Sequence, residues 1–364
     1  MQVTIVGLPG SGKTTVFNAL TGGHAETGGF SGSRAAPNVS VVKVPDERVD
    51  RLSALFNPKK TTYADVTYVD VAIPAGAARE GTINPDVLAL VRHADALLHV
   101  ARAFDDAAVT LPADPWRDVD ELDLEFTVAD LSVVEKRLEK LTTQGRHGSQ
   151  AERDQAQREE ELLRRIEPHL SDGRPIRSFG LTDDEELLLR GYRFLTQKPL
   201  LVVLNIDEGR LPEAATLEGE GRDRYGQPQT DVAALAGKIE EELGELGEDD
   251  ARLFMDDLGI AEPSRGRIIR LTYDLLGLFS FFTAGDDECR AWTLRRGATA
   301  VDAAGAIHSD LARGFIRAQV IGVDELIEAG SMAEARNRGI LRQEGKAYQV
   351  ADGDVIEVLF NVGR

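Results

Sequence analysis

The 364-residue sequence contains a single cysteine, Cys289, and only six histidines, which are scattered along the chain. One cysteine cannot form an intrachain disulfide, so we expect a reducing, cytoplasmic location. The lack of clustered cysteine and histidine argues against a structural zinc site. No apolar run is long enough to span a bilayer, and no basic segment precedes the first apolar run. We therefore expect neither a membrane partner nor a signal peptide.

Positively charged residues are also few relative to negatively charged ones. The chain has 42 lysines and arginines and 62 aspartates and glutamates, which gives a net charge of −20. A strongly acidic chain repels phosphate groups, which argues against broad nucleic-acid binding and against DNA as a partner. The imbalance is uneven, since residues 278–364 hold 10 lysines and arginines against 13 aspartates and glutamates. Only this C-terminal part is near enough to neutrality to approach RNA easily.

The first twenty residues, MQVTIVGLPGSGKTTVFNAL, predict a strand, a glycine-rich loop and a helix. The loop matches G-x-x-x-x-G-K-[ST] at every position, a pattern typical of phosphate binding. Glycines let backbone N–H groups point at phosphate oxygens, and the helix N-terminus adds positive potential. We expect Lys13 to reach the β- and γ-phosphates and Thr14 to hold Mg²⁺, which makes these two the predicted catalytic residues. The predicted nucleotide-binding residues of the loop are Gly7, Pro9, Gly10, Ser11, Gly12, Lys13, Thr14 and Thr15.

Strand and helix patterns alternate after the loop, which predicts an α/β domain with a parallel sheet and helices on both faces. Predicted strands lie at 39–44, 65–73, 96–104 and 200–205, and predicted helices at 47–55 and 87–93. Residues 231–243 predict a further strand, turn and helix. Asp70 lies near the end of its strand, where a carboxylate can hold Mg²⁺ through water or, alternatively, cap the strand. Residues 22–37 are rich in Gly, Ser and Thr and predict a mobile loop, where a first nucleotide switch would lie.

Two further segments differ from this α/β pattern. Apolar residues spaced by three and four predict a helical hairpin with a turn at 145–148, followed by a helix at 183–195. The hairpin is either a partner-binding arm or a solvated insert. After residue 277, strands at 279–284, 289–294, 314–321, 347–350 and 355–360 with a helix at 301–311 predict a β-grasp module. The apolar residues of the hairpin's first helix are Leu124, Val128, Leu131, Val134, Leu138 and Leu141.

The sequence therefore predicts four segments. A nucleotide-binding domain consists of residues 1–123 and 198–277 and is interrupted by a helical insert at 124–197. The β-grasp module occupies residues 278–364.

Several stretches resemble the YchF / Obg-like ATPase family. They are GLPGSGKTTVFNALTG, PNVSVVKVPDERVDRLSALFNPKK, ADALLHVARAF, LNIDE and the C-terminal run that begins FFTAGDDECRAWTL and ends DVIEVLFNV. The resemblance covers nearly the whole chain. It implies a Ras-like P-loop domain interrupted by a helical arm, a C-terminal TGS domain, a preference for ATP and an association with ribosomes.

The base motif agrees with ATP. GTP-binding relatives of this fold use Asn-Lys-x-Asp, whose Asp accepts hydrogen bonds from guanine. The corresponding stretch here runs from Asn205 to Glu208, lacks the Lys and carries a longer acid, so guanine recognition is lost. We predict that Asn205, Ile206 and Glu208 contact the nucleotide, and that Ala236 closes over the base.

The sequence departs from the family at the switch segments. The expected D-x-x-G is Asp70-Val71-Ala72-Ile73, and Pro74 takes the position of the family's hydrophobic residue. The switch threonine that ligates Mg²⁺ is absent from residues 33–37, and Thr27, Ser31 or Ser33 are the candidates to replace it. We therefore expect nucleotide binding with slow hydrolysis.

Three functions fit the sequence. The first is a Mg²⁺-dependent ATP-binding protein with slow hydrolysis and a ribosome or RNA contact. The second is a hydrolysis-deficient scaffold that acts through the TGS domain and the arm. The third is a small-molecule phosphotransferase with a helical lid, which would need lid arginines facing the phosphates. Candidate phosphate contacts in the C-terminal part, or else ordinary balancing surface charges, are Arg313, Arg317, Arg336, Arg338, Arg342 and Lys346.

Overall fold

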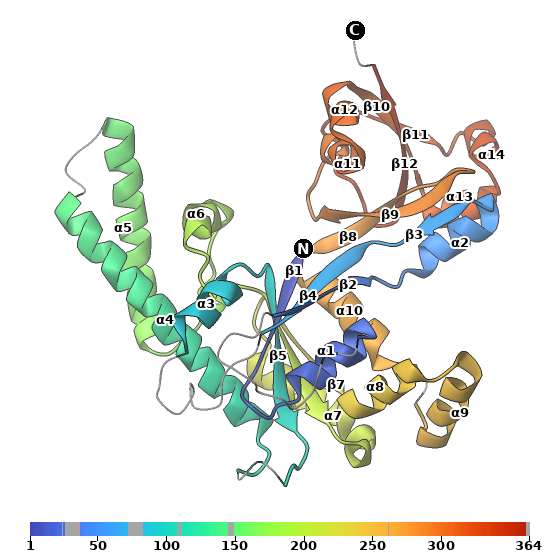
Figure 1. Cartoon of the computed structure of the whole chain (residues 1–364). Coiled ribbons are helices and arrows are strands. Elements are labelled where there is room, and N and C mark those ends of the chain that lie inside the picture. The colour runs from blue at the N-terminus through green and yellow to red at the C-terminus, as the bar shows by residue number, and fades with distance from the viewer. Residues whose placement is uncertain are drawn as a thin grey trace. The chain divides into compact units, whose positions relative to one another are not determined.

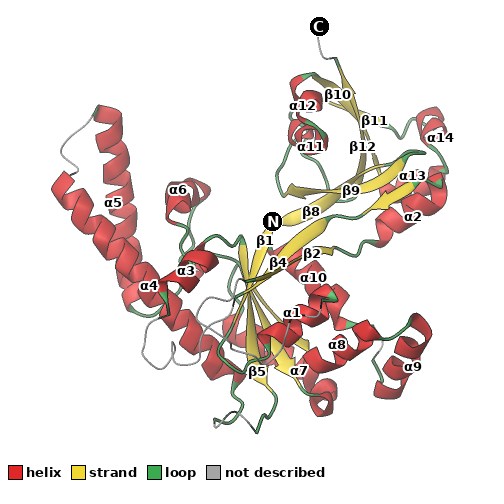
Figure 2. Cartoon of the chain, viewed as in Figure 1, coloured by secondary structure: helices red, strands yellow, loops and turns green. Residues whose placement is uncertain are grey.

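The computed structural model describes residues 1–23, 25, 37–71, 83–107, 109, 111–144, 149–260 and 262–361. Contacts group the chain into two compact units. Unit 1 contains Met1–Ser40 and Thr67–Ile268, and unit 2 contains Val41–Val66 and Ile269–Arg364. Each unit is built around a six-stranded sheet (Figures 1 and 2).

A mainly parallel sheet forms the centre of unit 1. Its strands are β1 (Gln2–Val6), β2 (Asn38–Lys43), β4 (Asp65–Asp70), β5 (Ala96–Ala103), β6 (Leu200–Ile206) and β7 (Thr230–Leu235). They lie in the order β2-β4-β1-β5-β6-β7. β1 pairs in parallel with β4 and β5, and β6 pairs in parallel with β5 and β7. The predicted parallel sheet is therefore confirmed, and the carboxyl ends of five strands meet at one edge.

Every residue of β5 and β6 is buried, which explains the uninterrupted apolar runs that these two strands show in the sequence. The helices that lie wholly in unit 1 are α1 (Lys13–Thr21), α3 (Pro85–Arg92), α4 (Pro115–Gln144), α5 (Gln150–Ser171), α6 (Asp183–Leu189), α7 (Ala214–Tyr225), α8 (Gly237–Glu245) and α9 (Glu248–Leu258). Short 3₁₀ helices are η1 (Ile176–Ser178), η2 (Arg190–Tyr192) and η3 (Glu208–Glu213). A core cluster joins β1, β5, β6 and β7 to α3, α4, α7 and α8. Among the described helices, none is long and apolar enough to cross a membrane.

The predicted helical hairpin is formed by α4 and α5, the green pair in Figure 1. α5 begins with a capping box, in which Ser149 and Glu152 each satisfy the other's backbone N–H. Leu138 of α4 packs in one apolar cluster with Leu163 and Ile166 of α5. The cluster also takes in Phe194, which lies beyond α6.

The apolar stripe predicted for the first arm helix is only partly buried. Leu124 and Val128 are exposed, whereas Val119, Leu122 and Phe126 lie in the core of the sheet. α4 is a single helix of 30 residues, and it packs first against the sheet and then against α5. Its apolar face therefore changes along its length, which a fixed heptad spacing does not describe.

Two predicted helices are too long. The helix predicted at 183–195 ends at Leu189 and is followed by η2, after which Arg193 takes a left-handed conformation with φ of +52°. The helix predicted at 301–311 is broken at His308, whose backbone is extended. The His308 side chain accepts a hydrogen bond from the Asp310 N–H and begins a new helix.

The sheet of unit 2 has the strand order β11-β10-β12-β8-β9-β3. Its strands are β3 (Lys60–Thr62), β8 (Leu278–Thr283), β9 (Glu288–Arg295), β10 (Phe315–Gly322), β11 (Arg342–Glu344) and β12 (Asp354–Phe360). The helices are α2 (Glu47–Phe56), α11 (Ala300–Ile307), α12 (Ser309–Arg313), α13 (Val323–Ala329) and α14 (Met332–Asn337), while α10 (Ser264–Leu275) spans the boundary between the two units. The predicted hairpin of β8 and β9 is confirmed by their antiparallel pairing.

No strand forms at 347–350, so the strand predicted there is wrong. Gln349 makes one isolated bridge, to Thr299. Both edges at the start of β12 are already paired, on one side with β10 and on the other with β8. The carboxylate of Asp354 instead accepts hydrogen bonds from the Ala351 N–H and the Tyr348 hydroxyl, which fixes this segment as a turn.

The sequence predicts residues 41–66 as part of the nucleotide-binding domain, whereas the contacts group them with the C-terminal residues. Arg48 donates a hydrogen bond to Asp352, and β3 pairs in parallel with β9. The bounds of the four predicted segments stay a prediction. Some predictions fall outside the described residues. These are most of the predicted mobile loop at 22–37, and all of Ile73, Pro74 and the turn at 145–148.

The first prediction concerns the arm. Leu163 is fully buried between α4 and α5, so Leu163→Ala should lower the free energy of unfolding by about 2–5 kcal/mol through lost burial and a residual cavity. Leu187→Ala is the matched control, because Leu187 is 66% exposed on α6, and it should change the value by less than about 0.5 kcal/mol. Urea unfolding followed by circular dichroism measures both. Equal effects would contradict the packing described here.

Candidate functional site

The glycine-rich loop between β1 and α1 depends on backbone conformations that other residues rarely adopt. Gly10 and Gly12 have φ of +80° and +82°. A Cβ on Gly12 would lie 2.2 Å from Nδ2 of Asn205, and one on Gly7 would lie 2.4 Å from the carbonyl oxygen of Val100. The loop can therefore pass close to β5 and β6 only with glycine at these positions.

The N-terminus of α1 is open to an anion. Gly12 precedes the helix and offers no side-chain cap, and the first turn contains no acidic residue. The first turn of the helix therefore has neither a capping side chain nor an acidic residue of its own, and the helix dipole favours negative charge there.

The Lys13 ammonium is buried and turned back on the loop. Its Nζ donates to the carbonyl oxygens of Gly7 and Leu8, each at 2.9 Å. Burial lowers the pKa of Lys13 to about 8, and the nearby Asp70 carboxylate opposes part of that change. The charge of this group is therefore poorly compensated without a ligand.

Thr14, at the start of α1, lies beside Asp70 at the end of β4. The Thr14 hydroxyl donates to Oδ2 of Asp70 at 3.0 Å, and Asn38 donates to the same oxygen at 3.4 Å. Oδ1 of Asp70 is buried and has no hydrogen-bond partner among the described residues. A hydroxyl beside an unsatisfied carboxylate oxygen fits Mg²⁺, which prefers one or two protein oxygens together with phosphate. Within the described ranges, no group of three or more His, Cys, Asp or Glu side chains forms a metal cluster.

Asn205 joins the loop to the next turn of the sheet edge. Its Nδ2 donates to the carbonyl oxygen of Ser11 at 3.1 Å, and its Oδ1 accepts from the Gly237 N–H at 3.2 Å. The side chain is buried, so both bonds are shielded from water. Asn205 thereby positions the phosphate loop relative to α8.

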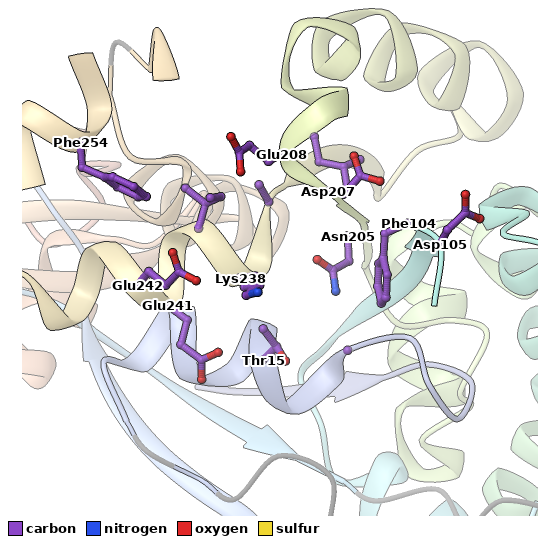
Figure 3. Close-up of a pocket in the computed structure, with 14 residues that line it drawn as sticks. Thr15, Phe104, Asp105, Asn205, Asp207, Glu208, Lys238, Glu241, Glu242 and Phe254 are labelled. Carbon is purple, nitrogen blue, oxygen red and sulfur yellow. The ribbon is translucent and has the colours of Figure 1, made fainter. Parts of the chain in front are cut away.

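A cavity of about 660 Å³ lies beside this bridge (Figure 3). Of the predicted site residues, it is lined by Gly12, Thr15, Asn205, Ile206, Glu208 and Ala236. The others predicted do not line it: Gly7, Pro9, Gly10, Ser11, Lys13 and Thr14 belong to the loop and the start of α1, and Asp70 ends β4. The predicted residues thus form a loop region and an adjoining cavity.

Eight lining residues were not predicted: Phe104, Asp105, Asp207, Lys238, Ile239, Glu241, Glu242 and Phe254. Phe104 lies beside Asn205 in Figure 3, because both come from the carboxyl ends of neighbouring parallel strands. That position was a usable signal, since ligands of parallel sheets bind at this edge. Phe254 lies on α9, for which the sequence offers no comparable signal.

The cavity is acidic, with five carboxylate side chains and one lysine among its lining residues. Glu241 also accepts a hydrogen bond from Asn18 of α1 at 2.7 Å, which connects α8 to the phosphate-loop helix. Phosphates would be repelled by these carboxylates and attracted to Lys13 and the N-terminus of α1. The arrangement suits a ligand with an anionic end on the loop and an uncharged end in the cavity.

Two family models match the sequence. The model of a GTPase C-terminal region described as "Protein of unknown function (DUF933)" matches residues 278–361. The model described as "50S ribosome-binding GTPase" matches residues 2–139.

Curated proteins called "Ribosome-binding ATPase YchF" are similar along the full length of the chain. The Bacillus subtilis protein is 38% identical and the Escherichia coli O157:H7 protein 34% identical, each with 98% of both chains covered. The solved structure of the Schizosaccharomyces pombe YchF GTPase matches with a TM-score of 0.85 and 27% identity, covering 99% of this chain and 97% of that one. The resemblance found in the sequence is confirmed, and this chain belongs to the YchF family.

Proposed function

We propose that this chain binds ATP with Mg²⁺ at the site described above and hydrolyses it slowly. The observation that carries the proposal is the buried Lys13, held in a complete phosphate loop whose Ser11 carbonyl accepts a hydrogen bond from Asn205. The triphosphate lies on the loop, where Lys13 exchanges two carbonyl acceptors for phosphate oxygens. Thr14 and Asp70 hold Mg²⁺, which supplies charge neutralisation at the phosphates.

The base occupies the adjoining cavity in this proposal. Asn205 uses its amide to hold the loop, and Ile206, Glu208 and Ala236 line the space for the base. The absence of the lysine and aspartate of a guanine-reading motif favours adenine. Phe104, beside Asn205, offers an aromatic face to the ring.

Slow hydrolysis follows from the switch sequence. Positioning and electrostatic stabilisation supply most of the catalysis in phosphoryl transfer, and Ile73 and Pro74 have no side chain that can orient water. The same substitutions support a second candidate function, a nucleotide-binding scaffold without hydrolysis. The scaffold does not cleave bound ATP and acts through its C-terminal domain and helical arm.

We also propose a ribosome contact, which is supported by the names of the relatives. Three of the cations considered either as phosphate contacts or as balancing surface charges are paired with carboxylates in unit 2, Arg313 with Asp310, Arg338 with Glu334 and Arg342 with Asp354. Arg317 and Lys346 are exposed and have no such partner among the described residues. If phosphate is contacted, these two are the available side chains.

The second prediction tests ATP binding. Lys13→Ala should abolish ATP binding in titration calorimetry, because it removes the buried cation that faces the phosphates. Lys346→Ala is the control and should keep the affinity of the unmodified chain. Single-turnover assays with bound ATP then separate the slow ATPase from the scaffold, in which no ADP forms. Unchanged affinity in Lys13→Ala would place the triphosphate elsewhere.

The third prediction concerns pH. The folded-state pKa of Lys13 is lowered to about 8, so most of this group is neutral at about pH 9, and a bound triphosphate should raise the pKa and draw in a proton. ATP affinity should therefore fall as pH rises through this window. Calorimetry in two buffers with different ionisation heats should show proton uptake. Lys13→Arg keeps its charge and should show none. Binding without proton uptake in the unmodified chain would refute the assignment.

The fourth prediction concerns the ribosome. Removing residues after 277 would expose the core that they share with residues 41–66, so surface substitutions are the cleaner test. Arg317→Glu combined with Lys346→Glu should weaken co-sedimentation with ribosomes and reduce its salt dependence, because fewer counterions are released. Arg153→Glu on the exposed face of α5 serves as the control. A stronger loss in the control would shift the contact to the helical arm.

A further inference from the structure

One edge of strand β12 is unpaired over most of its length. On one side β12 pairs antiparallel with β10, from Phe315 opposite Phe360 to Gly322 opposite Asp354. On the other side it meets β8 at a single position, Val355 opposite Phe282. Figure 1 shows β8 and β9 diverging from β10 and β12 towards the C-terminal end of β12. In the part of the chain that is described, no strand pairs with residues 356–360 on that side.

A cavity of about 570 Å³ lies along this unpaired edge. The β12 residues that line it are Val355, Ile356, Glu357, Val358 and Phe360. Successive residues of a strand point to opposite faces of a sheet. A cavity lined by both sets therefore lies beside the strand rather than over one face. Thr283, the last residue of β8, and Ala284, which follows it, also line the cavity. The cavity therefore lies where β8 would run if the strand continued beyond Thr283.

The two walls of the cavity differ in chemistry. On one face Val358 packs with Ile307 and Leu311 against an apolar cluster of unit 2. On the other face the lining residues include Glu357 of β12 and Met332 and Arg336 of α14. An occupant in extended conformation would meet an apolar wall with every second side chain and a charged wall with the others.

The sequence of this edge lacks two usual protections, lysine and proline; a register shift between Phe315 and Arg317 lies on its other side, in the ladder with β10. Natural edge strands carry lysine, proline or a bulge that discourages pairing with another chain. Residues 356–360 read IEVLF, with neither lysine nor proline, and Phe360 is 48% exposed. No strand within the described ranges pairs with this edge, and its N–H and C=O groups beside an apolar groove favour a polypeptide strand, because a strand satisfies both kinds of group.

We propose that an extended segment of a partner protein binds here and adds a strand to the sheet beside β12. The segment alternates apolar residues, which face Ile307 and Leu311, with polar residues that face Arg336 and Glu357. About five residues pair with the edge, a usual strand length. The proposal does not depend on nucleotide binding, so failure of one leaves the other intact.

The experiment uses the full-length chain and a fluorescent peptide of about eight residues that alternates valine with glutamate and lysine. A peptide of the same composition with its valines contiguous is the control. Fluorescence anisotropy should show binding of the alternating peptide alone. Alternate backbone N–H groups of an extended peptide point to opposite edges, so methylating every second nitrogen blocks one edge. Methylation on the edge that pairs with β12 should weaken binding at least about tenfold, and methylation on the other edge should not. Hydrogen exchange should show β12 amides becoming protected in the complex.

Matched variants locate the site. Phe360→Asp should weaken peptide binding at least about tenfold, whereas Ile316→Asp should not, because Ile316 is 57% exposed on neighbouring β10 but does not line the cavity. Ala333→Trp fills the cavity from α14 without altering β12, and it should also block binding. This variant still tests the site if Phe360→Asp folds poorly.

The proposal is overturned by no binding at millimolar peptide, by equal binding of the two peptides, or by indifference to N-methylation in both registers. It is also overturned if Ala333→Trp leaves binding unchanged. A single-stranded oligouridylate that binds in place of the peptide, with the same dependence on Phe360, would assign the edge to nucleic acid instead.

Discussion

The side-chain amide of Asn205 holds the candidate site together. It is buried between the carbonyl oxygen of Ser11 and the N–H of Gly237, so it connects the phosphate loop to the turn before α8. The contact is possible only because Gly12 has no side chain, since a Cβ there would overlap the Asn205 amide. A polar bridge inside a dry sheet edge is strong as well as directional, and it fixes the loop before any ligand arrives.

The electrostatics of the site have two parts that complement each other. Burial works against the charge on Lys13, while Asp70 keeps one carboxylate oxygen unsatisfied nearby. Both are costs that a Mg²⁺-triphosphate would relieve, since phosphate oxygens pair with the ammonium and the metal binds the carboxylate. The acidic cavity next to them repels phosphate, so in the proposed function the triphosphate lies on the loop and not in the cavity.

In unit 2 most of the candidate cationic side chains are engaged within the unit, whereas one strand edge is not paired. Most arginines predicted to contact phosphate are engaged by neighbouring carboxylates or, for Arg336, by the amide of Gln319. The feature left open is the edge of β12, whose N–H and C=O groups face a partly apolar cavity. The same strand therefore completes the core of this unit and presents an unpaired edge.

The phosphate loop, most strands of both sheets and the family were predictable from the sequence. These features depend on local patterns, such as the glycine spacing from Gly7 to Gly12 and the apolar runs of β5 and β6. Helix ends were predicted less well, because the break at His308 and the left-handed turn at Arg193 depend on individual capping and packing contacts.

Within the site, the loop residues, Asp70 and Asn205 carry a sequence signal, because each lies at the carboxyl end of a strand or within a motif. The sequence by itself determined the parallel sheet of unit 1 and the presence of a phosphate loop, since short-range patterns dictate both. Only the tertiary structure decided that Phe254 reaches the cavity, that residues 41–66 pack with the C-terminal unit, and that β12 keeps a free edge. These outcomes depend on which distant segments pack together, and no local pattern encodes that choice.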